Sequence, residues 1–318
     1  MHPILKLVAQ PLALGCLLLL AASVLIFIGT QILPGDVAAA ILGQGATEQA
    51  LANMRADLGL DRPAITRYLE WLFNALQGDF GVALSNGRDI AESIAGRMKN
   101  TIFLASVAAV VSVPLSIFLG LLAVRYRDRW PDRLISAVTL TSISLPEFLL
   151  GYVIMFVFSV KLGWFNSVSN INDGMSFGEK LGAVALPATV LTLVVLAHMM
   201  RMTRAAILNV MQSAYIETAE LKGLSTFEVI RKHAFPNAIA PIVNVVMLNL
   251  AYLVVGVVVI EVVFVYPGMG QYLVDHVSKR DVPVVQASGL IFATIYIGLN
   301  LLADIVSILS NPRLRHPK

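Results

Sequence analysis

The sequence predicts an all-α membrane protein with six transmembrane helices. Its 318 residues are 57% hydrophobic and only 14% charged, with a mean hydropathy of +0.78, whereas soluble domains carry about 25% charged residues. The apolar residues gather in six long runs, and a helix needs about 20 such residues to cross the hydrocarbon core of a bilayer. A water-soluble domain is therefore excluded.

The first apolar run covers residues 12–33 and follows Lys6. The Ala-rich residues 36–40 resemble a signal-peptidase site, so a cleaved signal peptide is one alternative. The apolar region of a signal peptide is only about 7–15 residues long, however, and this run is long enough to cross the bilayer. We therefore predict an uncleaved first span within residues 1–33.

Residues 34–100 have ordinary polarity and several glycines, which are typical of turns. Apolar residues at helical spacing predict two amphipathic helices, at residues 47–58 with Thr47 as the cap, and at residues 63–76 with Pro63 in the first turn. This segment is predicted to be a small extracytoplasmic helical domain between spans one and two.

The remaining residues, 101–318, are predicted to form a membrane core. Pro114 predicts a kink in the second span, and Pro146 interrupts the third span directly before Glu147. Spans two to six are predicted at residues 101–124, 134–160, 185–204, 239–265 and 284–309.

The basic residues predict the orientation of the chain. Arg and Lys concentrate in the short loop after Arg125, in residues 201–232 and in the C-terminal tail. Cytoplasmic loops carry such an excess of positive charge. Six spans with both termini in the cytoplasm satisfy this distribution.

The longest polar passage of the second half covers residues 215–241. A short helix is expected from Glu217 until Gly223 stops it. Ser225, followed three residues later by Glu228, has the spacing of a capping box and predicts the start of a second helix, which Pro236 is expected to end. Two short helices at an angle would form a rigid contact point for a partner.

This passage resembles the EAA loop of ABC importer permeases, E-A-A-x-x-x-G-x(9)-I-x-L-P. Thr218 replaces the middle Ala, His233 the Ile and Phe235 the Leu, and the wording T-A-x-x-K-G-L-S resembles the dipeptide/oligopeptide/nickel branch in particular. In that family the loop couples the permease to a cytoplasmic ATPase. The resemblance assigns a coupling loop to residues 205–238 and coupling roles to Glu217, Thr218, Ala219, Lys222, Gly223, Leu224, Ser225 and Pro236.

Further wording supports the same resemblance. Residues 261–286, EVVFVYPGMGQYLVDHVSKRDVPVVQ, resemble a segment of this branch, and the ending NPRLR resembles its D-P-R-x-R tail with Asn311 in place of Asp. The resemblance implies the small (type I) ABC importer arrangement in a bacterial inner membrane. It also implies a second homologous permease, one or two cytoplasmic ATPases and an extracytoplasmic solute-binding protein as partners. Peptide is the expected solute, although relatives carry dipeptides, oligopeptides, nickel chelates, glutathione, opines or sugars.

The sequence lacks the common motifs of nucleotide binding and hydrolysis. It contains no G-x-x-x-x-G-K-[ST], no H-E-x-x-H and no G-x-S-x-G, and its single cysteine, Cys16, lies in an apolar run. We therefore expect a pore subunit that is no enzyme and binds no cofactor or metal, with ATP and magnesium bound by the partner ATPases. The net charge of +3 gives no reason to expect nucleic acid. One alternative is an ATP-independent secondary transporter or channel, which an inverted internal repeat or paired broken spans would favour. Another is a membrane-embedded enzyme, which would need clustered catalytic groups at one depth.

Ionisable residues within membrane spans are costly and indicate functional sites. Pro146, Glu147 and Glu261 are therefore candidates for the translocation path or a gate, with an internal hydrogen bond as the alternative for Glu147 and pinning of the following loop as the alternative for Glu261. His198 is expected at the cytoplasmic interface. Position along the chain makes the turn of Tyr266, Pro267, Gly268 and Gly270 a candidate contact for the binding protein.

Overall fold

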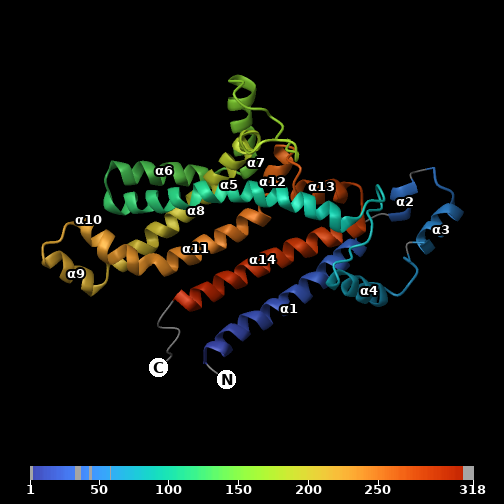
Figure 1. The fold of residues 1–318 in the computed structure, drawn as a ribbon, viewed down its shortest axis with the longest axis horizontal. Coiled ribbons are helices and arrows are strands. Elements are labelled where there is room, and N and C mark those ends of the chain that lie inside the picture. The colour runs from blue at the N-terminus through green and yellow to red at the C-terminus, as the bar shows by residue number, and fades with distance from the viewer. Residues whose placement is uncertain (1–2, 33–36, 43–44, 58, 311–318) are drawn as a thin grey trace.

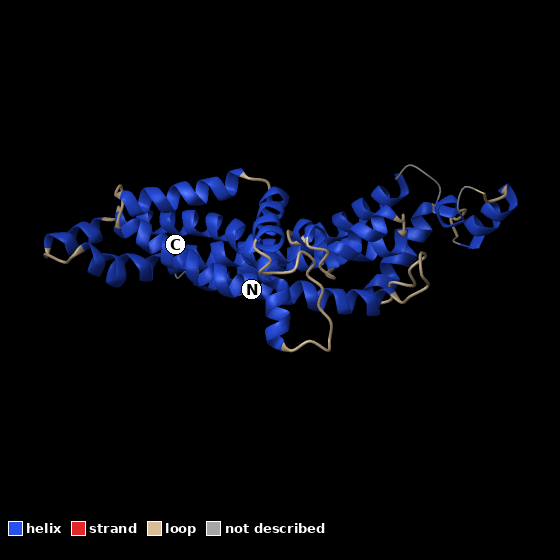
Figure 2. Ribbon diagram, turned by 90° about the horizontal axis from the view of Figure 1, so that it is seen from above, coloured by secondary structure: helices blue, strands red, loops and turns tan. Residues whose placement is uncertain are grey.

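The computed structural model describes residues 3–32, 37–42, 45–57 and 59–310, and these residues form helices and loops without a regular strand (Figures 1 and 2). The molecule is elongated, and its long helices run along the long axis (Figure 1). The helices before the coupling loop are α1 (Pro3–Ile32), α2 (Val37–Leu42), α3 (Glu48–Asp57), α4 (Ala64–Leu76), α5 (Ile90–Arg125), α6 (Trp130–Ser144), α7 (Glu147–Met155), the π-helix η1 (Phe156–Lys161) and α8 (Phe177–Met211).

The second half of the chain begins with short helices and ends with the long helix α14. Its elements are α9 (Ala214–Leu221), α10 (Thr226–Val229), the π-helix η2 (Ile230–Ala234), α11 (Phe235–Val255), α12 (Val258–Val263), α13 (Met269–Ser278) and α14 (Val282–Ser310).

Five stretches of helix in the described residues are long and apolar enough to cross a membrane, and the bent pair of α6 with α7–η1 can supply a sixth. α8 lies against α5, α6 and α11, and α14 lies between α11 and α1. Side chains of α5, α7, α8, α11 and α12 form the largest apolar core. Elsewhere many large apolar residues are exposed on the spans, as a surface that contacts lipid or another membrane subunit requires.

Several predicted spans are longer in the structure. α5 covers 90–125 where 101–124 was predicted, α8 covers 177–211 where 185–204 was predicted, and α14 slightly exceeds 284–309. Hydropathy marks the part of a helix that fits the hydrocarbon core, but backbone hydrogen bonding continues into polar surroundings. Asp89, whose side chain accepts a hydrogen bond from the N–H of Glu92, starts α5 well before its apolar part.

The third predicted span is not one straight helix. α6 ends at Ser144, and α7 begins after Pro146 at an angle of 104°. The break at Pro146 is confirmed, but α7 and η1 leave the direction of the other spans and project from the side of the molecule (Figure 1). A proline disfavours helical backbone at the residue before it, which explains the extended conformation of Leu145.

The prediction that Pro236 ends a helix is wrong. α10, η2 and α11 follow one another without a break, and Pro236 lies in the first turn of α11. A proline in a continuous helix lacks one N–H and its ring crowds the preceding turn. The π-helical stretch Ile230–Ala234 directly before it provides a wider turn at this point. Much of the predicted coupling loop is therefore helical and continuous with the fifth span.

The segment between the first two spans contains the two predicted helices as α3 and α4. The Oγ1 of Thr47 accepts a hydrogen bond from the N–H of Ala50 at 3.3 Å, as its predicted role as a cap requires. α4 packs on α1, where the rings of Phe27 and Tyr68 lie 5.4 Å apart. Residues 90–100, predicted as part of this segment, belong to α5.

Candidate coupling and transport sites

Residues 205–238, called the coupling loop here after their predicted role, lie at one end of the long axis, and α2 and α3 lie at the other end (Figure 1). α9 is anchored by the buried side chains of Ile216 and Ala219, which pack in an apolar cluster with Ile207 of α8 and Val229 and Ile230 of the following helix. Burial of this one side of α9 fixes its position on the membrane helices. The opposite side, with Glu217, Thr218 and Lys222, is exposed.

Gly223 ends α9 in a Schellman motif. Its φ is +84°, its N–H donates to the carbonyl of Glu220 at 2.8 Å, and the N–H of Leu224 reaches back to the carbonyl of Ala219 at 3.4 Å. A Cβ at this position would meet no atom within 4 Å. Glycine is therefore needed for its backbone conformation and not for close packing.

Ser225 and Glu228 form the predicted capping box. The Oγ of Ser225 accepts from the N–H of Glu228 at 3.4 Å, and the carboxylate of Glu228 accepts from the backbone N–H of Ser225 at 3.4 Å. The same carboxylate lies 3.4 Å from the ammonium of Lys232, one turn further on. The capping box therefore fixes Ser225 as the residue at which α10, the second helix of the coupling loop, begins.

Two contacts that sequence reasoning missed lie in or beside the coupling loop. The guanidinium of Arg125, at the end of α5, lies 4.8 Å from the ring centre of Phe227. Arg204 of α8 donates two hydrogen bonds, of 3.0 and 2.8 Å, to the carboxylate of Asp132 in α6. The positive-inside pattern accounted for both arginines as topology markers, but it carried no information about their partners.

One large apolar residue on the exposed side of the coupling loop was also missed. Leu221, the last residue of α9, is 82% exposed. An isolated exposed leucine needs no explanation, but this one projects beside Glu217, Thr218 and Lys222 from the surface that the EAA resemblance assigns to the ATPase.

Glu261 is fully buried and holds the turn that follows α12. Its carboxylate accepts hydrogen bonds from the Oγ1 of Thr101 at 2.6 Å and from the backbone N–H groups of Gly270 at 2.7 Å and Gln271 at 3.1 Å. Thr101 in turn accepts from the N–H of Met269 at 2.8 Å. These contacts are those of a residue that pins the loop, and Glu261 borders none of the cavities described below.

The turn itself is packed too tightly to offer much surface. A Cβ on Gly268 would strike the carboxylate of Glu261, and a Cβ on Gly270 would lie 2.5 Å from the Cα of Val258. Tyr266 is also buried, and its hydroxyl donates to the carbonyl of Asn100 at 2.7 Å. The prediction that Tyr266, Gly268 and Gly270 contact a binding protein is therefore corrected, because only Pro267 of the four is partly exposed.

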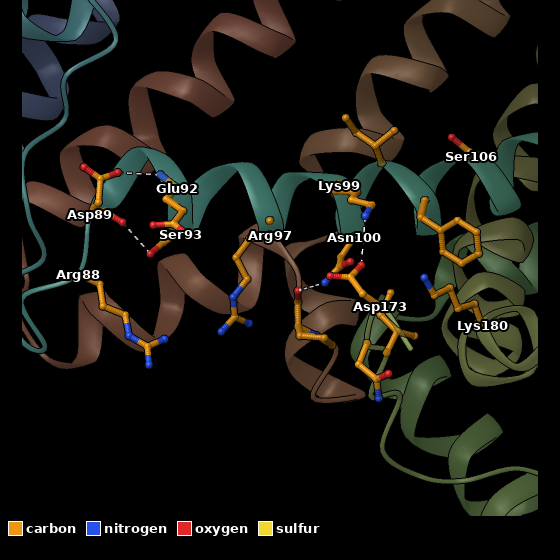
Figure 3. Close-up of a pocket in the computed structure, with 16 residues that line it drawn as sticks. Arg88, Asp89, Glu92, Ser93, Arg97, Lys99, Asn100, Ser106, Asp173 and Lys180 are labelled. Carbon is orange, nitrogen blue, oxygen red and sulfur yellow. Dashed lines mark hydrogen bonds and ion pairs between the residues drawn. The ribbon is translucent and has the colours of Figure 1, made fainter. Parts of the chain in front are cut away.

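Pro267 borders a polar cavity of about 920 Å³ beside the first turns of α5 (Figure 3). Arg88 and Arg97 extend along the same side of the helix, while Lys99 forms an ion pair of 3.1 Å with Asp173 from the loop before α8. This hydrogen bond and the positive charge of Lys99 hold the pKa of Asp173 below its usual value. The cavity carries charges of both signs at the end of the molecule opposite to the coupling loop.

A second cavity, of about 630 Å³, lies at the break between α6 and α7. Pro146 and Glu147 border it together with Tyr252 of α11, whose hydroxyl donates a hydrogen bond to the carboxylate of Glu147. Ser142, His198 and Asn249 complete its polar lining. Glu147 therefore makes the internal hydrogen bond that was one alternative for it and also borders a cavity, while its role in the translocation path stays a prediction.

His198 lies within α8, which continues past it to Met211, and it is exposed between the buried residues Ala197 and Met199. Its place at the cytoplasmic interface stays a prediction. Within the described part of the chain, no group of three or more His, Cys, Asp or Glu could hold a metal ion.

Comparison with known families agrees with this architecture over almost the whole chain. Residues 4–105 match the N-terminal component of binding-protein-dependent transport membrane proteins, and residues 112–316 match the family described as the inner membrane component of binding-protein-dependent transport systems. The chain belongs to this family.

Two relatives are similar to this chain over almost its whole length. It is 38% identical over 298 residues to the glutathione transport system permease protein GsiC of Escherichia coli, covering 94% of this chain and 95% of the relative. It is 36% identical over 313 residues to a putative peptide transport system permease protein of Brucella abortus, covering 98% of both chains. The prediction of an ABC importer permease of the dipeptide/oligopeptide/nickel branch is confirmed. The protein is a multi-pass membrane protein, and its family works with a solute-binding partner.

Proposed function

We propose that this permease forms one half of an import pathway for small peptides, and that a second homologous permease forms the other half. The coupling loop carries the proposal. It is anchored on α5, α8 and α11 by a buried apolar cluster and presents an exposed polar side at one end of the molecule. Such a rigid projection can transmit a movement of a bound ATPase to the spans.

The ATPases are proposed as separate cytoplasmic subunits, one or two in number, that bind ATP and magnesium. The permease itself is then a pore subunit and no enzyme, in keeping with a sequence that lacks a phosphate-binding loop. Glu217, Thr218, Lys222 and Leu221 are exposed and would contact an ATPase, whereas Ala219, Gly223, Ser225 and Pro236 would maintain the shape of the loop.

The orientation follows from the same assignment. If the coupling loop lies in the cytoplasm, the beginning of α1 and the end of α14, which lie on the same half of the molecule, lie towards the cytoplasm as well (Figure 1). The basic residues of the loop after Arg125 support this orientation. α2, α3 and the polar cavity at Pro267 then face the extracytoplasmic side, where a solute-binding protein would dock.

The solute is proposed to be a peptide because the named relatives are a glutathione permease and a putative peptide permease. Purification of the tagged permease from its native membrane in mild detergent tests the whole assignment. We expect a second permease and ATPase subunits to be recovered with it, and ATP hydrolysis to rise when the binding protein and a peptide are added. A permease that is recovered alone, even after crosslinking through a cysteine placed at Ser225, would contradict the proposal and favour an ATP-independent carrier.

A further inference from the structure

The cavity at the α6–α7 break brings hydrogen-bond acceptors together. The hydroxyl proton of Tyr252 is donated to Glu147, and the side-chain amide of Asn249 donates to the carbonyl of Val245 at 2.8 Å. The hydroxyl of Ser142 likewise donates to the carbonyl of Val138 at 3.0 Å. With these protons engaged, the carboxylate of Glu147 and the oxygens of Tyr252 and Asn249 remain available to accept hydrogen bonds.

Glu147 is the only acidic residue that borders this cavity, and no lysine or arginine is among the described residues around it. Within the described part of the chain it forms no ion pair. An ionised carboxylate among membrane spans is expensive unless it is compensated, and the helix N-terminus of α7 together with one tyrosine hydroxyl compensates it only in part. A positively charged group that enters the cavity would complete the compensation.

Apart from His198, the rest of the lining is apolar. Val194 and Val195 of α8 and Leu248 of α11 border the cavity opposite the break. A site with an apolar wall and a few convergent polar groups fits a small organic solute better than a hydrated inorganic ion.

We propose that this cavity binds the protonated amino group of the solute during its passage, with Glu147 as the counter-ion. Tyr252 orients the carboxylate through its hydrogen bond, and the carbonyl oxygen of Asn249 accepts a second proton of the ammonium group. The apolar wall contacts the side chains of the solute. This inference rests on the proposed import of peptides and adds that the permease, and not only the binding protein, selects for a free amino group.

Import into proteoliposomes that contain the complete transporter tests the proposal. The probes are trialanine and N-acetyl-trialanine, supplied with the binding protein at concentrations that saturate it with each peptide. The wild-type complex is expected to import trialanine faster than its acetylated form. Glu147→Gln should lower the import of trialanine about tenfold, which corresponds to about 1.4 kcal/mol, and should leave import of the acetylated peptide unchanged.

Two matched variants separate recognition from structure. Asp128→Asn neutralises an exposed carboxylate at the far end of α5, where asparagine tolerates the φ of +63°, and should change neither import rate. Tyr252→Phe removes the hydrogen bond but keeps the charge, and should preserve the preference for the free amine. Assembly and basal ATP hydrolysis of each variant show that the complex is intact.

The outcomes separate this inference from the proposed peptide solute. Equal loss of both peptides in Glu147→Gln, with a matching loss in Tyr252→Phe, would reduce Glu147 to a structural role and overturn the inference alone. Unchanged import of trialanine by Glu147→Gln would overturn it as well. A wild-type complex that imports neither peptide, although its binding protein is saturated, would overturn the proposed peptide solute and this inference with it.

Discussion

At the scale of single residues, Gly223 connects a backbone conformation with the proposed coupling to an ATPase. Its Schellman motif sets the angle at which the chain leaves α9 towards α10, and the space around it is open. The effect of a substitution therefore comes from φ alone. For a residue with a Cβ, the left-handed conformation costs about 1–2 kcal/mol, and less for asparagine.

Gly223→Val is expected to reduce the solute imported per ATP hydrolysed, because a β-branched residue at positive φ displaces the exposed side of α9. Gly223→Asn should retain most of the coupling. Import and ATP hydrolysis are measured together in proteoliposomes, and the amount of inserted permease is measured by immunoblot. Normal coupling in the valine variant would show that the angle after α9 is not important.

Gly268 illustrates the opposite requirement, because here the backbone must approach a buried carboxylate. Gly268→Ala would place a methyl group against Glu261 and separate the carboxylate from Thr101 and Gly270. We expect a clear fall in the midpoint of thermal unfolding in detergent, since overpacking of a buried site costs typically about 1–3 kcal/mol. Gly178→Ala, where no atom lies within 4 Å of the added Cβ, is the control and should leave the midpoint unchanged. Equal midpoints for both variants would contradict the tight packing of this turn.

At the scale of helices, the ion pair between Asp132 and Arg204 joins α6 to α8 close to the coupling loop. The side chain of Asp132 is 6% exposed and that of Arg204 is 28% exposed, so the pair is poorly screened by water. Removal of one partner leaves the other charge partly buried and uncompensated.

Asp132→Asn is expected to destabilise the permease by on the order of 2 kcal/mol, because the guanidinium of Arg204 loses a charged acceptor. The measurement is thermal unfolding in detergent. Lys99→Met, which breaks the exposed pair with Asp173, serves as the control and should have little effect because exposed ion pairs contribute about 0–1 kcal/mol. A control variant as unstable as Asp132→Asn would show that burial does not distinguish the two pairs.

At the scale of the whole molecule, the coupling loop and the segment of α2–α4 lie on opposite halves of the long axis (Figure 1). If the spans cross a bilayer in the proposed orientation, these two regions lie on opposite sides of the membrane. Both regions offer exposed positions for labelling, at Ser225 and at Gln77 after α4.

In a Cys16→Ala background, a membrane-impermeant maleimide applied to intact cells should label Gln77→Cys and leave Ser225→Cys unlabelled. Inside-out vesicles should give the reverse result. The expectation follows from the proposed topology with both termini in the cytoplasm. Labelling of both positions from the same side would contradict it.

The sequence by itself determined the approximate positions of the long apolar helices, the break at Pro146, the cap at Ser225, the glycine stop at Gly223 and the family. Hydropathy, helix capping and turn conformation depend on residues that are close together in the chain, so consecutive residues carry the information. Hydropathy did not predict the ends of α5 and α8, which are longer than expected, because the length of an apolar run does not mark where a helix begins or ends.

Only the tertiary structure decided which distant residues meet. It paired Glu147 with Tyr252, placed His198 in the same cavity, joined Asp132 to Arg204 and buried Tyr266 and Gly270 behind Glu261. It also showed that Pro236 does not end a helix, because the wider π-helical turn before it lets the helix continue into α11. These contacts depend on how helices far apart in the chain pack against each other, and the rotation and crossing of packed helices are properties that no local pattern of residues contains.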